Sequence, residues 1–247
     1  MRIGKAVRPL VWTVAACVLF TAGWAAYMVT DPFAGQRQQA LQHQLYQQWG
    51  EGPAVGGGGA AGPLRQDRIR LRTGRPFALI RIPALGRDWR FAIVQGTGAS
   101  QLALGPGHVP DTALPGQLGN FAVAAHDITA GNAFLHLGSL RPPDRILIYT
   151  RRWEYEYVVR SERVVRYTDV AVEYPVPGHP HAPPHHALIT LITCTPATLT
   201  FTPWRIVVTG QLESAFVWRA PLRAATLVAG ASRSFKLGSR NHPFSRG

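Results

Sequence analysis

Short hydrophobic runs separated by glycine, proline and asparagine fill the chain between about residues 77 and 212. Seven of these runs have the length and composition of β-strands, and they cover residues 77–83, 88–96, 119–126, 144–150, 153–165, 186–194 and 204–212. Alternation of polar and apolar residues over 153–165 indicates a strand with one wet face, whereas the continuous apolar run over 187–192 indicates a central strand buried on both faces. The pattern predicts an all-β sandwich or barrel of seven or eight strands.

Two other segments have helical or linker character. The glutamine-rich residues 31–48 are compatible with a helix, and the spacing of Phe134, Leu137 and Leu140 predicts a short helix over residues 132–140. The run GEGPAVGGGGAAGP, residues 50–63, has too little apolar surface to fold and is typical of a flexible linker. We therefore expect a stalk and linker over residues 31–66, a folded domain over residues 67–216 and a basic, disordered tail over residues 217–247.

The first thirty residues contain a candidate membrane anchor. Residues 9–30 carry no charge and are long enough to cross a bilayer as a helix. Basic residues precede this run and Asp31 follows it, so the positive-inside tendency places residues 1–8 in the cytoplasm and the folded domain outside the cell membrane. The alternative is a cleaved or lipidated signal peptide ending near Cys17, but the apolar run continues well past that residue.

Charge and cysteine content restrict the function further. The net charge of +13 comes almost wholly from arginine, since lysine occurs only at positions 5 and 236. An extracytoplasmic location excludes nucleic acid and leaves anionic lipid or an anionic polymer as charge partners. Cys194 is the only thiol outside the predicted anchor, so no disulfide forms within the domain. A lone cysteine in an oxidising compartment is either buried and inert or kept for its reactivity.

Two basic side chains are predicted to lie near this thiol. His126 ends the predicted strand 119–126 just as Cys194 ends the strand 186–194, and two strands that end on one rim would bring imidazole and thiol together. Arg205 begins the next strand, where a guanidinium could donate hydrogen bonds to an oxyanion. Cysteine, histidine and arginine at strand ends predict nucleophilic acyl chemistry.

The sequence TLITC at residues 190–194 resembles the TLxTC motif of the sortases, membrane-anchored cysteine transpeptidases of Gram-positive bacteria. His126 and Arg205 stand at the spacings that this family shows, and the segment leading to His126 is similar to that of class E sortases. The resemblance extends over roughly residues 77–213. It implies a closed eight-stranded β-barrel with one or two short helices, and no cofactor or metal.

The resemblance also implies a reaction and partners. Cys194 would attack the Thr–Gly bond of an LPXTG- or LAXTG-like C-terminal sorting signal, with His126 as acid and base and Arg205 steadying the oxyanion. A peptidoglycan-precursor amine or a pilin lysine would resolve the thioester. Thr193, Leu191 and His186 are the candidates for substrate binding. The alternatives are a purely hydrolytic cysteine protease and a noncatalytic anchored barrel that binds anionic cell-wall polymer.

Three features lie outside this match. Class E sortases commonly have arginine after the histidine, whereas here Asp127 reverses that charge; on a regular strand the two side chains would point to opposite faces. The run GHPHAPPHH, residues 178–186, lacks the partners and spacing of a zinc site, and its prolines predict a loop. The resemblance implies that this loop lines the substrate groove. His108 is predicted to be a turn residue.

Overall fold

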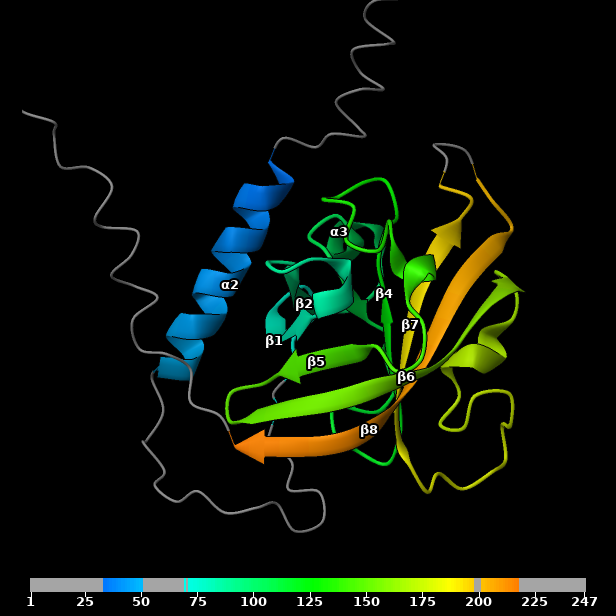
Figure 1. The fold of residues 1–247 in the computed structure, drawn as a ribbon. Coiled ribbons are helices and arrows are strands. Elements are labelled where there is room, and N and C mark those ends of the chain that lie inside the picture. Colours follow the sequence, from blue (N-terminus) through cyan, green and yellow to red (C-terminus); the bar gives the residue numbers. More distant parts are fainter. Residues whose placement is uncertain (1–32, 51–68, 70, 198–200, 218–247) are drawn as a thin grey trace, which may run out of the picture.

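The seven hydrophobic runs form strands that, together with one further short strand, close into a single barrel (Figure 1). The protein is represented by a computed structural model that describes residues 33–50, 69, 71–197 and 201–217. In the order in which they neighbour one another around the barrel, the strands are β1 (Pro76–Arg81), β2 (Arg90–Gln95), β3 (Gly107–His108), β4 (Gly119–Ala124), β7 (Ala187–Thr195), β8 (Trp204–Val217), β6 (Trp153–Arg166) and β5 (Arg145–Tyr149). The predicted closed eight-stranded barrel is confirmed.

Strand β3 is the one strand that the hydrophobic pattern did not show. It has only two residues, too few for any periodicity, yet it lies parallel to β2 and antiparallel to β4 and so completes the barrel wall. The prediction that His108 is a turn residue was wrong, because this side chain is buried with 1% of its surface exposed. Its ring is held by Gln95 at 2.7 Å and by the Thr112 hydroxyl at 2.9 Å.

The barrel interior is filled by alternate residues of its strands. On β4 the buried core residues are Phe121 and Val123, and on β7 they are Ile189 and Leu191. Because side chains alternate across a strand, the intervening residues of both strands belong to the outer face. This alternation decides on which side of the wall the strand-end residues lie.

Four short helices complete the described part of the chain besides the long helix α2 (Ala34–Gly50). They are η1 (Pro83–Leu85), α3 (Ala99–Leu102), η2 (Leu137–Ser139) and η3 (Val170–Glu173). The helix predicted over residues 132–140 is reduced to the single turn η2, in which Leu137 is buried. No helix within the described ranges is long and apolar enough to span a membrane, and the anchor predicted for residues 9–30 lies outside those ranges, as do the Gly-rich linker and the tail after Val217.

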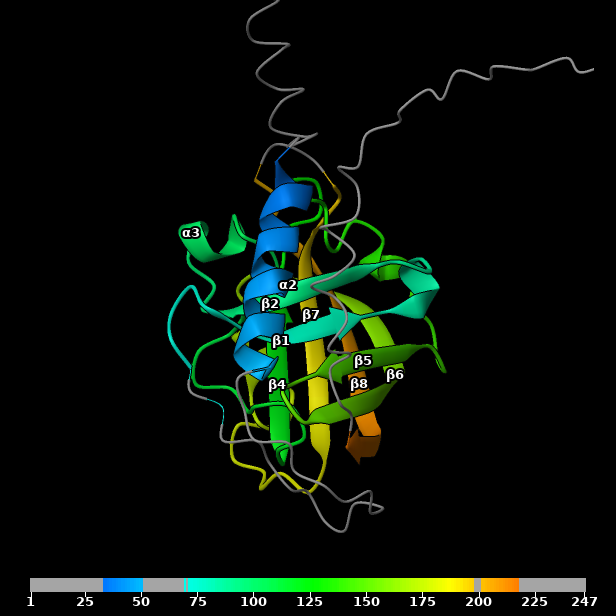
Figure 2. The same ribbon diagram turned by 90° about the vertical axis from the view of Figure 1, so that its left-hand side faces the viewer.

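Helix α2 lies along the outside of the barrel against β1 and β2 (Figures 1 and 2). Leu45 and Trp49 pack on Leu79 and Ala92 in a second hydrophobic cluster. The predicted helix is confirmed, but its expected role as part of a stalk was wrong, because its apolar residues are buried against the barrel. The helix is part of the folded domain.

Gln38 of α2 also substitutes for a missing strand partner. Among the described residues, no strand neighbours the edge of β2 beyond the short β3, and the side-chain oxygen of Gln38 accepts the amide hydrogen of Ala92 at 2.9 Å. The side-chain nitrogen of Gln38 donates to the carbonyl of Leu104. Gly105 leaves the necessary space, since a Cβ there would lie 2.1 Å from that nitrogen. One buried amide thus satisfies two backbone groups.

Replacing Gln38 by alanine is expected to destabilise the protein. A buried polar group left without its partner costs about 1–3 kcal/mol, and this change leaves both the Ala92 amide and the Leu104 carbonyl unpaired. We expect the free energy of unfolding, measured by urea denaturation, to fall by about 2–4 kcal/mol. The neighbouring Gln39 is exposed, so Gln39→Ala is the matched control and should change stability by less than about 0.5 kcal/mol. Equal losses in the two variants would contradict the bridging role.

Candidate active site

The histidine and cysteine strands end side by side at one rim of the barrel. Strands β4 and β7 are parallel neighbours, with Ala124 opposite Ile192, and the amide of Ala125 continues the ladder to the Ile192 carbonyl at 3.1 Å. His126 lies two residues after Ala124, and Cys194 lies two residues after Ile192. The backbone carbonyl of His126 accepts the amide hydrogen of the buried Phe134 at 3.1 Å, which fixes the start of the following loop to the core.

Two buried threonine hydroxyls tie the cysteine strand to the histidine strand. Thr190 donates to the side-chain oxygen of Asn120 at 2.7 Å, and Thr193 donates to the backbone carbonyl of Ala125 at 2.9 Å. The second bond lies immediately beside both Cys194 and His126. These two bonds give a physical role to the two threonines of TLITC, because they fix the relative position of the two strand ends.

Arg205 faces Cys194 from the opposite neighbour of β7. The two residues are directly paired in the antiparallel ladder between β7 and β8. One guanidinium nitrogen of Arg205 donates to the carbonyls of Thr202 at 2.7 Å and Trp204 at 2.8 Å, and the guanidinium carbon lies 5.9 Å from the ring centre of Tyr167. The side chain is therefore held at the rim rather than extended into solvent.

All three side chains belong to the same face of the wall. Cys194 alternates with the core residues Ile189 and Leu191, and Arg205 alternates with Val208, so both lie on the outer face. His126 follows β4 in the same outward phase. Cys194 is a free thiol of intermediate burial, and His126 is likewise half-buried. The rim presents a nucleophile, a group for proton transfer and a hydrogen-bond donor together, the combination that cysteine acyl transfer needs.

Burial and nearby charges set the protonation of the two reactive groups. Burial raises the pKa of the Cys194 thiol, the positive charge of Arg205 opposes this, and the negative charge of Asp127 adds to it. Burial lowers the pKa of His126, and Asp127 opposes that shift. The neutral thiol and neutral imidazole are thus favoured in the resting site, and the reactive thiolate forms with the help of Arg205.

Asp127 is a buried carboxylate within this site. Only 5% of its surface is exposed, and its Oδ1 accepts the amide hydrogen of Ile128 at 2.9 Å while Oδ2 is buried without a hydrogen-bond partner. The strand rule that would turn Asp127 away from His126 does not extend this far, because the backbone ladder to β7 ends at Ala125. Asp127 consequently acts on the charges of both His126 and Cys194.

Replacing Asp127 by asparagine is expected to move the pH profile of catalysis toward lower pH. The negative charge raises the pKa of both His126 and Cys194, so its removal lowers both, and both limbs of a bell-shaped plot of kcat/KM against pH shift to the acid side. The profile is measured with a fluorogenic peptide. The exposed Asp88 supplies the control Asp88→Asn, which should leave the profile in place; an unchanged profile in Asp127→Asn would refute the electrostatic role.

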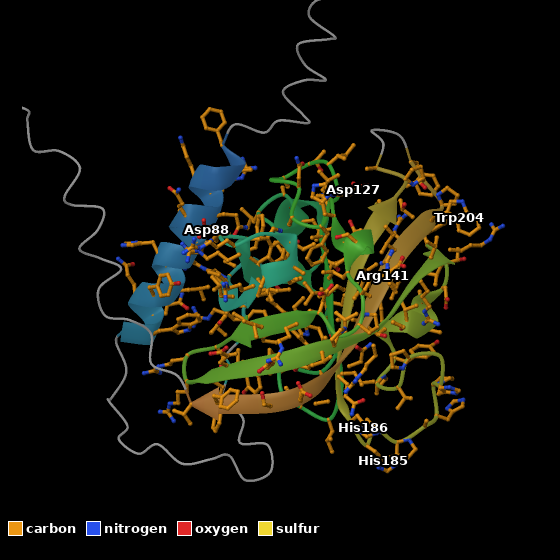
Figure 3. The ribbon with its side chains drawn as sticks, in the orientation of Figure 1. Asp88, Asp127, Arg141, His185, His186 and Trp204 are labelled. Carbon is orange, nitrogen blue, oxygen red and sulfur yellow. The ribbon has the colours of Figure 1, made fainter. Side chains whose placement is uncertain are left out.

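The structure does not bring the predicted substrate-binding residues together. Thr193 lies at the site, but it is 3% exposed and its hydroxyl is engaged within the protein. Leu191 is fully buried in the barrel core and has no surface to offer a substrate. His186 precedes β7 and lies at the opposite end from Cys194, roughly 25 Å along the strand. Figure 3 shows His185 and His186 at the end of the molecule opposite to Asp127 and Trp204.

His185 and His186 of the loop 178–186 therefore lie far from Cys194. Within the described residues, no group of three or more histidine, cysteine or acidic side chains is arranged to hold a metal ion.

Sequence reasoning missed two residues that shape the site. Thr202 donates its hydroxyl to the Thr195 carbonyl and accepts the amide hydrogen of Trp204 at 3.3 Å, which fixes the start of β8 beside the end of β7. Tyr167 supplies the ring beneath Arg205. Neither has a signal in the local pattern, because each meets the site only through the pairing of β6, β7 and β8.

A thiol, an imidazole and a guanidinium on one rim of a closed barrel define a cysteine acyl-transfer site. The sortase domain family matches residues 80–213, more than half of the chain. The chain therefore belongs to the sortase family, whose members are cysteine transpeptidases.

Individual relatives agree with this assignment. The chain is 34% identical to sortase SrtE1 of Streptomyces coelicolor over 148 residues, which is 56% of this chain and 41% of that relative's length. The solved structure of sortase E from Streptomyces avermitilis is similar with a TM-score of 0.53 and 35% identity, covering 59% of this chain and 93% of that one. The SrtF sortase of Corynebacterium diphtheriae has a TM-score of 0.58 and 28% identity, covering 68% and 98%.

Proposed function

We propose that this protein is a membrane-anchored transpeptidase that cleaves a C-terminal sorting signal of the LPXTG or LAXTG type and attaches the protein to a cell-wall amine. The observation that carries the proposal is the meeting of Cys194, His126 and Arg205 on the outer face of one rim, in a chain of the sortase family. An outward-facing site lets a peptide strand approach from solvent.

The reaction begins when the proton of the Cys194 thiol passes to His126, which gives a thiolate and an imidazolium. The thiolate then attacks the carbonyl carbon between threonine and glycine of the signal. Electrons move onto the carbonyl oxygen, where the guanidinium of Arg205 donates hydrogen bonds to the developing oxyanion. The imidazolium of His126 gives a proton to the departing glycine amine, and the acyl group remains on sulfur as a thioester.

The second half of the reaction reverses these proton movements. Neutral His126 takes a proton from the incoming amine, which attacks the thioester and releases the thiolate. A peptidoglycan precursor is the proposed amine donor, and a pilin lysine has the same chemistry. The proposed location follows from the uncharged residues 9–30, with residues 1–8 in the cytoplasm and the barrel outside.

Product analysis tests the transfer step. The full chain is incubated with an LAXTG peptide, with and without a glycine-based amine, and the products are separated by mass. We expect the amine to divert product from the hydrolysed peptide to the amide-linked one, in proportion to its concentration. Cleavage that gives only hydrolysed peptide at every amine concentration would identify a hydrolytic protease. If no peptide of this type is cleaved, the result would favour a noncatalytic barrel that binds wall polymer.

A further inference from the structure

Exposed aromatic rings gather beside the catalytic Arg205. Tyr167, Phe201 and Trp204 expose 53%, 74% and 39% of their surfaces. The rings of Tyr167 and Phe201 meet edge to face with centres 5.3 Å apart, and Arg166 lies over Trp204 at 5.0 Å. We call these three rings, with Arg166 and Arg205, the aromatic rim.

The aromatic rim joins two strand ends at the active site. Trp204 pairs with Thr195 across β7 and β8 and with Arg166 across β6 and β8, and the amide of Tyr167 donates to the Pro203 carbonyl at 2.8 Å. Trp204 is thus held by a strand directly beside the Cys194–Arg205 pair, Tyr167 directly follows the end of β6, and Phe201 contacts the Tyr167 ring. None of the three is needed to fill the barrel core, so their exposure calls for an external partner.

The composition of the aromatic rim fits a lipid interface better than it fits a soluble partner. Tyrosine and tryptophan combine an apolar body with a polar tip and accumulate at the level of lipid headgroups. Arginine extends its apolar stem along such a surface while its charge stays among anionic headgroups. The two segments that form the rim, residues 163–167 and 201–205, contain three arginines and no acidic residue.

The position of helix α2 places the proposed anchor at the same end of the barrel. Its first residue, Ala34, packs on the loop that follows His126, since a Cβ on Gly131 would lie 3.1 Å from the Ala34 Cβ. In Figures 1 and 2 helix α2 begins at the end where β7 finishes and β8 starts. Figure 3 shows Trp204 and Asp127 at that end.

The uncharged run ends at residue 30, three residues before the exposed Phe33. Three residues span at most about 10 Å, so a bilayer holding residues 9–30 would lie within that reach of the start of α2. The barrel cannot then be held far from the membrane at this end.

We propose that the aromatic rim rests on the membrane surface and turns the active-site end of the barrel toward the bilayer. This inference rests on the proposed anchor and on the proposed function, and it assigns the surface to anionic lipid. The anchor and the aromatic rim would contact the membrane at two separate places on one face of the domain. Two contacts fix the orientation of the domain as well as its distance from the bilayer. Cys194 would then meet an acyl donor that is itself held at the membrane.

Photocrosslinking of the full chain in lipid nanodiscs tests this orientation. The nanodiscs contain phosphatidylglycerol and phosphatidylcholine, and Phe201 is replaced by p-benzoylphenylalanine in a Cys194→Ala background, so the result does not depend on catalysis. Phe216 is the matched control, because it is 54% exposed on β8 but near the end of that strand opposite to Trp204. We expect lipid adducts from position 201 at least tenfold more often than from position 216.

Several outcomes would overturn the proposal. They are equal or absent lipid adducts at the two positions, adducts at position 201 only with an added sorting-signal peptide, and failure of the full chain to enter nanodiscs. Transpeptidation of a soluble peptide by the unlabelled chain is measured in parallel. Loss of that activity refutes the proposed function, whereas normal activity without lipid adducts refutes only the membrane orientation.

Discussion

Replacing Cys194 by alanine is expected to reduce peptide cleavage and transfer by at least about 10⁴-fold, to the background of the assay. The thiolate forms the bond to the acyl group, and no other thiol belongs to the described barrel, so no neighbouring side chain can take over this step. Fluorogenic peptide cleavage measures the rate, and intact-protein mass spectrometry measures the thioester adduct, which should be present in the wild type and missing in the variant.

Serine at the same position gives a second expectation. A hydroxyl is far less acidic than a thiol, and in a half-buried site that already raises the pKa of Cys194 it would stay neutral. Cys194→Ser should therefore be nearly as inactive as Cys194→Ala. Unchanged urea denaturation would show that both variants fold. Peptide cleavage by Cys194→Ala at the wild-type rate would mean that the thiol does not act as nucleophile.

Replacing Arg205 by alanine is expected to lower kcat by about 10²–10³-fold, the usual effect of removing one oxyanion donor. A second effect follows from its charge. Arg205 lowers the pKa of Cys194, so its removal raises that pKa further and shifts the pH dependence of iodoacetamide alkylation toward higher pH. The two measurements, kcat and alkylation, distinguish the oxyanion role of Arg205 from its effect on the thiol pKa, because alkylation requires the thiolate but no oxyanion donor.

Lysine at position 205 distinguishes charge from geometry. Arg205→Lys keeps a positive charge near the thiol but loses the planar fork, so alkylation should stay close to the wild type while kcat remains low. The exposed Arg160 on β6 provides the control Arg160→Ala, which should leave both measurements unchanged. A normal kcat in Arg205→Ala with a normal alkylation profile would contradict its place in the site.

The strands with clear periodicity were predictable, and the parts that close the barrel were not. The runs that became β4 and β7 were located to within two residues because alternation and turn residues bound them. The start of β8 was located as well, but the strand continues to Val217, past the predicted end at residue 212. Strand β3 has no pattern of its own and exists because β2 and β4 pair with it. Helix α2 was predicted as a helix, but its docking depends on tertiary contacts such as those of Leu45 and Gln38.

The same division applies to the site. His126, Cys194 and Arg205 could be selected because each lies at the end of a predicted strand, and parallel and antiparallel pairing then places them together. The family resemblance pointed to His186 as a groove residue, but it did not show how far this residue lies from Cys194. A strand of nine residues lies between it and the cysteine loop. The burial of Asp127 depends on where β4 ends, a boundary that a sequence pattern locates poorly.

Because Gln38 and its helix α2 cover the edge of β2, the position at which the enzyme is shortened affects its solubility. A fragment trimmed to the eight strands would begin after the Gly-rich linker and would discard α2, leaving Leu79 and Ala92 uncovered and a backbone donor open on the edge of β2. An uncovered strand edge next to apolar surface is a template for pairing with another chain. Such a fragment would be prone to aggregate while still containing every catalytic residue, so soluble versions should begin at or before residue 33.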